Sequence, residues 1–167
     1  MCGGRAEEKT SKGGGNPMQR IAQAKTILTM LPYVDQYRRE IARSNQYHAL
    51  KSFYGVHDTF QVMDRIIEKT YKSQYLENLK NKAEEQLNAG PPKYRKALEL
   101  FFFAGMKQPE IAVEMDICKR TAYRLVEKAT EWFATKLNAA GVTQEAFDRL
   151  VRDYGWIGAI YAEFSPR

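Results

Sequence analysis

The chain has 167 residues, of which 44% are hydrophobic and 28% charged, proportions typical of one ordinary globular domain or of a small domain with a helical appendage. These values exclude wholesale disorder, and no stretch approaches the roughly 18 uninterrupted apolar residues that a membrane span needs. The formal net charge of +6 permits a polyanionic partner such as nucleic acid without requiring one.

The first segment, residues 1–17, is polar and rich in glycine, and it lacks the apolar stretch of a signal peptide. We expect a disordered tail here. A second interpretation stays open, because the codons of Lys12, Gly13 and Gly14 can form a bacterial ribosome-binding sequence shortly before Met18. In that case residues 1–17 are a translated leader, and the working protein begins at Met18.

Residues 18–55 carry apolar side chains at helical spacing. Ile21, Ala24 and Leu31 share one face of the first stretch, and a similar pattern continues from Tyr33 to Gly55. Pro32 stands between the two stretches. Because its ring lacks an N–H and clashes with the preceding turn, we expect a kink or a break there.

A second helix is expected from Asp58, a suitable N-cap, to about Asn88. Its apolar stripe consists of Val62, Ile66 and Leu76, with Met63, Ile67 and Tyr71 beside them. Gly90 suits a left-handed C-cap, and the two prolines after it cannot continue the helix. Residues 18–89 therefore predict a helical segment, a hairpin or a small bundle. Its long second helix is a candidate homodimer element, with a purely core role as the alternative.

Residues 91–140 predict a helix-turn-helix DNA-binding domain. A first helix over Lys93–Ala104 ends at Gly105, and a second begins at Gln108, where Pro109 suits the first turn and Glu110 complements the helix dipole. Asp116 marks the turn, because aspartate tolerates left-handed backbone better than most residues. The buried positions have helix-turn-helix spacing: Ile111, Ala112, Met115, Ile117, Ala122 and Leu125.

The helix after this turn has two chemically different faces at about 100° per residue. One face is apolar, with Ala122, Val126, Ala129, Phe133 and Leu137. Arg120, Arg124 and Lys128 lie nearly opposite, with Tyr123 at their flank. Four basic residues, Lys119 included, stand against the single acid Glu127 between positions 117 and 128, a local net charge of +3. Such a face suits a DNA major groove, where arginine pairs with guanine and lysine contacts phosphate; a cationic surface helix without a partner is the alternative.

The segment Pro91–Leu137 resembles the region 4 helix-turn-helix of sigma-70-type factors. It resembles more closely the phage and prophage regulators that carry such a module behind a helical N-terminal segment. The resemblance rests on the helix that ends at Gly105, the EIAVEM element and the Ile-x-x-x-Thr-Ala-Tyr-Arg recognition helix. Two residues depart from the pattern: Asp116 stands where glycine is usual, and Cys118 where serine or threonine caps the recognition helix. The resemblance implies that the DNA-reading positions are Lys119, Arg120, Thr121, Tyr123 and Arg124.

Cysteine and histidine provide no chemical site. Cys2 and Cys118 cannot build a disulfide framework, and no Cys/His pair, His48 and His57 included, has metal-ligand spacing. Cys118 is expected to be a tolerated small residue, with a redox sensor beside Lys119 and Arg120 as the alternative. Because the sequence also lacks a phosphate-binding glycine loop and a nucleophile–base pair, we expect no enzymatic activity and no cofactor, in a reducing cytoplasm.

Residues 141–167 form a C-terminal helical tail. Thr143 caps an amphipathic helix, whose apolar side is Ala146, Phe147, Leu150, Val151 and Tyr154. We expect this helix and the apolar residues after it to pack on the core. A contact patch for RNA polymerase or for a second subunit is the alternative.

The sequence as a whole predicts an all-α, sequence-specific DNA-binding transcription regulator of phage or mobile-element origin. Double-stranded DNA is the expected partner, and RNA polymerase and a second copy of the chain are further candidates. A self-sufficient sigma factor is disfavoured, because no tryptophan precedes Pro91 to serve promoter melting. Two alternatives stay open: a small terminase-like DNA-packaging subunit that assembles as a ring, and a helical interaction module with a degenerate helix-turn-helix.

Overall fold

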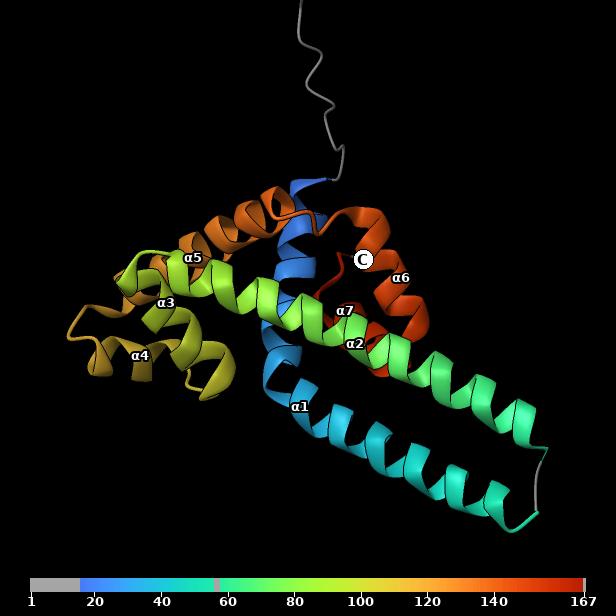
Figure 1. Ribbon diagram of the computed structural model, residues 1–167. Helices are drawn as coiled ribbons and strands as arrows, with labels where there is room; N and C mark the ends of the chain where they lie inside the picture. Colours follow the sequence, from blue (N-terminus) through green and yellow to red (C-terminus); the bar gives the residue numbers. More distant parts are fainter. Residues whose placement is uncertain (1–15, 56–57, 167) are drawn as a thin grey trace, which may run out of the picture.

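The computed structural model describes residues 16–55 and 58–166, and every regular element in that part of the chain is helical (Figure 1). The all-α prediction is therefore confirmed. The expectations for Cys2, His57 and the tail or leader lie wholly or mostly outside the described residues. The elements are α1 (Pro17–Phe53), α2 (Thr59–Ala89), α3 (Pro92–Leu98), the π-helical turn η1 (Glu99–Phe103), α4 (Gln108–Glu114), α5 (Lys119–Ala139), α6 (Gln144–Asp153) and α7 (Gly155–Phe164).

Helices α1 and α2 form a long antiparallel hairpin (Figure 1). Pro32 lies inside α1, which stays helical through it and changes direction between its darker and lighter blue parts in Figure 1. The kink expected at this proline is therefore present, and the helix does not break. Asp58 caps α2 as predicted, since its carboxylate accepts a hydrogen bond from the Phe60 N–H at 3.1 Å.

The end of α2 corrects the prediction for Gly90. This residue has φ −81° and ψ 173°, an extended conformation and not the left-handed one expected for a C-cap. Its lack of a side chain serves a close approach instead. A Cβ built on Gly90 would lie 2.0 Å from Cη2 of the Trp132 ring, so the α5 indole occupies the space that any other residue would fill.

The main core lies where the base of the hairpin meets α5 and the two C-terminal helices. Its members come from all three predicted segments, so this core crosses both predicted boundaries, near residues 90 and 141. The largest fully buried side chains in this cluster are Ile27, Leu28, Met30, Leu76, Leu98, Phe133, Phe147, Leu150 and Ile157.

The C-terminal tail packs on this core, as expected. Thr143 caps α6 by accepting a hydrogen bond from the Ala146 N–H at 3.3 Å. The Tyr154 hydroxyl, which follows α6, donates a hydrogen bond to the Lys72 carbonyl of α2. A second helix, α7, packs against α1 and was not foreseen. Within the described residues, no helix has both the length and the apolar character needed to cross a membrane.

Candidate nucleic-acid interface

A second, smaller core holds the helix-turn-helix together. It consists of Ala97 from α3, Ile111 from α4, and Leu125 and Val126 from α5. Six partly buried apolar side chains surround it: Tyr94, Leu100, Phe101, Met106, Met115 and Ile117. Four of the six residues predicted to be the inner side of this motif are found in or around this core, namely Ile111, Met115, Ile117 and Leu125, and the other two, Ala112 and Ala122, are buried. Ala112 is 4% exposed, as expected for a small residue where two helices cross closely.

The start of α4 follows its sequence signals. Gly105 ends the preceding helix with φ +67°, a left-handed conformation that glycine adopts without strain. The Glu110 carboxylate accepts a hydrogen bond from the Lys107 N–H at 2.7 Å, and Pro109 lies in the first turn. These contacts fix the direction in which α4 leaves the loop.

The turn between α4 and α5 is a Schellman motif. The Ile117 N–H donates to the Ala112 carbonyl at 2.9 Å, and the Asp116 N–H donates to the Val113 carbonyl at 3.2 Å. Asp116 has φ +53°, the left-handed conformation that the sequence predicted. The motif tolerates Asp116 in the glycine position because aspartate is among the residues that enter this region most readily.

Cys118 is the N-cap of α5 and makes no capping hydrogen bond with its side chain, which confirms that the thiol caps poorly. Its Sγ lies 3.0 Å from the Thr121 hydroxyl oxygen. This hydrogen bond, together with the positive ends of the nearby backbone N–H groups at the helix N-terminus, lowers the pKa of the exposed thiol below its ordinary value.

The outer face of α5 carries all six residues predicted to contact DNA: Lys119, Arg120, Thr121, Tyr123, Arg124 and Lys128. All six are exposed, and Tyr123 keeps 48% of its surface accessible. None of the four cations forms a salt bridge with a described residue. Their charge is therefore available to an external anion, unlike that of Arg95 on α3, which pairs with Glu99 at 2.8 Å.

Helix α5 belongs to both cores. Its first half contributes Leu125 and Val126 to the small core, and its second half contributes Ala129, Phe133 and Leu137 to the main one. The basic outer face of α5 is thus held by a single continuous helix that is anchored in the body of the protein.

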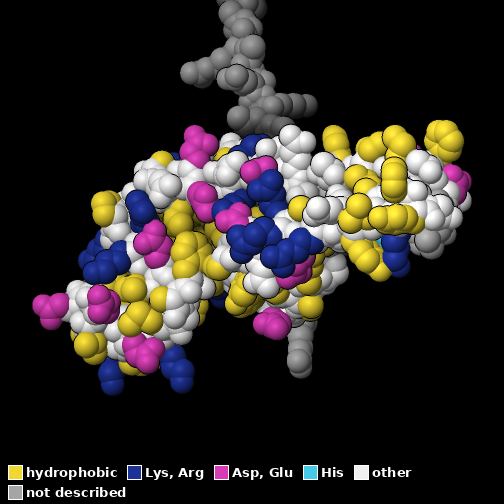
Figure 2. Space-filling view, turned by 60° about the horizontal axis from the view of Figure 1, so that its bottom comes forward, with side chains coloured by type: hydrophobic (Ala, Val, Ile, Leu, Met, Phe, Trp, Pro, Cys, Tyr) yellow, Lys and Arg dark blue, Asp and Glu magenta, His cyan; other side chains and the backbone are white. Residues whose placement is uncertain are grey.

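Two features escaped the sequence reasoning. The π-helical turn η1 sends the neighbouring residues Phe101 and Phe102 to different places, the former against the small core and the latter against the main one. The outer surfaces of the hairpin carry large apolar side chains, six of them aromatic: Tyr33, Tyr47, Phe53, Tyr54, Phe60 and Tyr71. Figure 2 shows hydrophobic side chains dominating the right end of the molecule, whereas acidic and basic groups mix over the left. The absence of tryptophan before Pro91 therefore does not mean that aromatic surface is absent there.

Comparison with known protein families gives a match over most of the chain. The family model of ECF sigma factors matches residues 5–139, which include the hairpin as well as the helix-turn-helix. No curated protein and no solved structure matches the chain.

Proposed function

The chain belongs to the ECF sigma factor family, and from this premise we propose that it regulates transcription by binding promoter DNA through the basic face of α5 and by associating with RNA polymerase. The family is one of non-enzymatic, DNA-binding transcription regulators of the sigma-70 type. The observation that carries the proposal for α5 is its row of exposed cations without salt-bridge partners, on a helix fixed by two cores.

The residues of this face have different roles in the proposed complex. Lys119 and Lys128 neutralise backbone phosphates as point charges, which supplies affinity without sequence information. Arg120 and Arg124 reach base edges, where a guanidinium pairs bidentately with guanine O6 and N7. Tyr123 adds an apolar ring with a hydroxyl at the same surface. The four cations do not have to break internal salt bridges before they bind, since none of them forms one in the described structure.

The extent of the family match bears on what the hairpin does. The likeness to sigma factors is not confined to residues 91–137, because the match begins at residue 5. We therefore include the hairpin in the same functional unit. Phage or mobile-element origin stays a prediction, as do the packaging-subunit and interaction-module alternatives.

A salt titration of binding to random-sequence duplex DNA tests the α5 face. We compare the wild type with a Lys119/Arg120/Arg124 triple alanine variant. Random-sequence DNA offers the two arginines no matching bases, so on this probe Arg120 and Arg124 contact phosphates as Lys119 does. Each lost phosphate contact lowers the log–log salt slope by about 0.9, so the variant should flatten it by roughly two to three units. An Arg39/Lys82/Arg149 triple alanine variant removes the same charge from exposed sites on α1, α2 and α6 and should change the slope by less than about one unit.

Two results would overturn the proposal. In the first, the wild type fails to bind DNA at low salt. In the second, both triple variants share one slope, which would mean that binding follows total charge and not the α5 face.

A further inference from the structure

The far end of the hairpin carries a large apolar surface that nothing in the described structure covers. We define the tip surface as Phe53, Tyr54, Phe60, Met63, Ile67 and Tyr71, whose exposed fractions run from 51% to 84%. At ~200 Å² for a large apolar side chain, these residues present on the order of 800 Å². That area exceeds the roughly 300–600 Å² of the largest apolar patch on a typical monomer.

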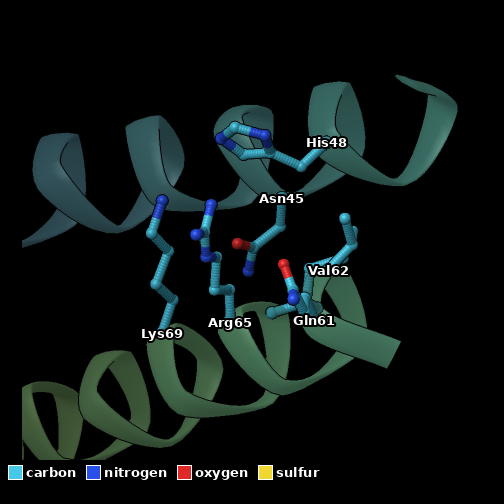
Figure 3. A pocket seen from close by; sticks show the side chains of 7 residues that line it. Asn45, His48, Gln61, Val62, Arg65 and Lys69 are labelled. Atoms are coloured by element: carbon cyan, nitrogen blue, oxygen red, sulfur yellow. The ribbon is translucent and has the colours of Figure 1, made fainter. Parts of the chain in front are cut away.

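The seam between α1 and α2 is polar in the same region, the reverse of an ordinary hairpin. Val62 is the one buried residue among the described positions between 35 and 75. A cleft of about 190 Å³ there is lined by five polar or basic side chains and by the apolar Val62 and Ile66. Figure 3 shows Arg65 and Lys69 reaching from α2 toward α1 while Asn45 reaches into the gap. The Asn45 amide donates to the Thr70 hydroxyl at 3.3 Å, but its Oδ1 is buried without a hydrogen-bond partner in the described structure.

A hairpin with a polar seam and apolar outer faces has little of its own to stabilise it. Helix pairs are stabilised mainly by burial of an apolar stripe. Between positions 35 and 75 this pair buries one described residue, whereas it exposes eight large apolar ones, the six of the tip surface together with Tyr47 and Leu50. The apolar burial that would stabilise this helix pair must therefore be supplied by a binding partner. The exposed area is close to the roughly 800 Å² that one partner contributes to a stable interface.

We propose that the tip surface is the interface through which two copies of this chain form a permanent homodimer. A surface of this size on a free chain invites aggregation, so it needs a partner that is present from synthesis onward, and the same chain meets that condition. The distribution of charge also favours contact between two copies at this surface. The whole chain carries +6, whereas residues 43–71 hold four cations against three carboxylates, a net +1 that lets two copies approach there. The tip also lies at the opposite end of the molecule from α4, so the α5 face stays uncovered in the dimer (Figure 1).

Sedimentation velocity of the full chain at micromolar concentration, without DNA or polymerase, tests the proposal. The wild type should have twice the chain mass of 19.3 kDa. Ile67→Glu/Tyr71→Glu should be monomeric, with a dimer dissociation constant raised at least about 100-fold. Gln74→Glu/Asn78→Glu makes the same charge change on the next exposed turns of α2 and should stay dimeric. A monomeric wild type, or equal behaviour of the two variants, would refute the dimer.

A second measurement uses the wild type alone, in case the acidic substitutions unfold the hairpin. Amide hydrogen exchange of residues 60–71 should slow as protein concentration rises through the dissociation constant. If the exchange rate does not depend on protein concentration and falls only when RNA polymerase is added, the tip surface binds polymerase and the proposal is overturned. The Lys119/Arg120/Arg124 variant should remain dimeric, so loss of DNA binding and loss of dimerisation are separate results.

Discussion

Replacing Gly90 with alanine tests the contact between the end of α2 and the Trp132 ring. The added Cβ would lie 2.0, 2.6 and 2.8 Å from three carbons of that ring, against an ordinary contact distance of 3.4–4 Å. The ring is rigid, and it is held beside Tyr94 with ring centroids 5.9 Å apart. The ring or the backbone must therefore shift by about 1.4 Å to restore a contact distance of 3.4 Å. Overpacking of this kind costs about 2–3 kcal/mol of unfolding free energy.

Urea denaturation of a small glycine series separates the causes. Gly105→Ala meets open space but has φ +67°, so it should cost about 1–2 kcal/mol from backbone strain alone. Gly155→Ala meets open space without a positive φ and should be neutral or stabilising by about 0.5 kcal/mol. In a Trp132→Leu background, Gly90→Ala should cost less than about 1 kcal/mol, a coupling of about 2 kcal/mol. An equal cost in both backgrounds would mean that Gly90 acts through its backbone conformation, and the packing argument would fail.

Three further predictions concern the turn before α5. Asp116→Gly should raise the unfolding free energy by about 0.5–1 kcal/mol, since glycine holds φ +53° without strain; an unchanged urea midpoint would contradict this. Cys118→Ser should stabilise the chain by about 0.5–1 kcal/mol by supplying the missing cap, and a loss of thermal stability would argue against it. The Thr121 hydroxyl lowers the pKa of the Cys118 thiol. Iodoacetamide should therefore modify the thiol of the Cys2→Ser variant with a lower pH midpoint when the protein is folded than when it is unfolded in urea. Thr121→Val should reduce the difference between these two pH midpoints. A pKa lowered by folding also means that the linked stability is present above the unfolded pKa and is lost as pH falls through the folded one.

The helix-turn-helix was predictable because its signals are local. Gly105, Pro109 and Asp116 each determine backbone conformation within one or two residues, and the 3.6-residue period alone separates the two faces of α5. The positions of Arg120, Tyr123, Arg124 and Lys128 follow directly from that period, whereas the resemblance to sigma-70 region 4 added Lys119 and Thr121 as candidate DNA contacts. What they bind does not follow, because exposure and charge are properties of the surface and not of its partner.

The hairpin and the C-terminus were less predictable because the deciding contacts join distant parts of the chain. Helix α2 carries apolar residues on two opposite faces, and periodicity cannot tell that Leu76 is buried while Ile67 is 60% exposed. The role of Gly90 depends on Trp132, 42 positions later. Helix α7 is too evenly apolar to show an amphipathic period, so its existence depends on the surface of α1 against which it packs.

The sharing of α5 between two cores has a consequence for how the protein can be divided. A fragment limited to residues 91–140 would carry Phe133 and Leu137 with no main core to receive them, so we expect the helix-turn-helix not to fold as an independent module. Substitutions at the outward positions of α5 should disturb the fold less than excision of the helix-turn-helix, because these positions take no part in either core. DNA held at a hundredfold excess over its dissociation constant would add about 2.7 kcal/mol to the stability of the folded state. Because α5 is part of the main core, this added stability would also extend to the hairpin base and the C-terminal helices. Increased protease resistance in these regions, far from the DNA, would therefore show that DNA is bound.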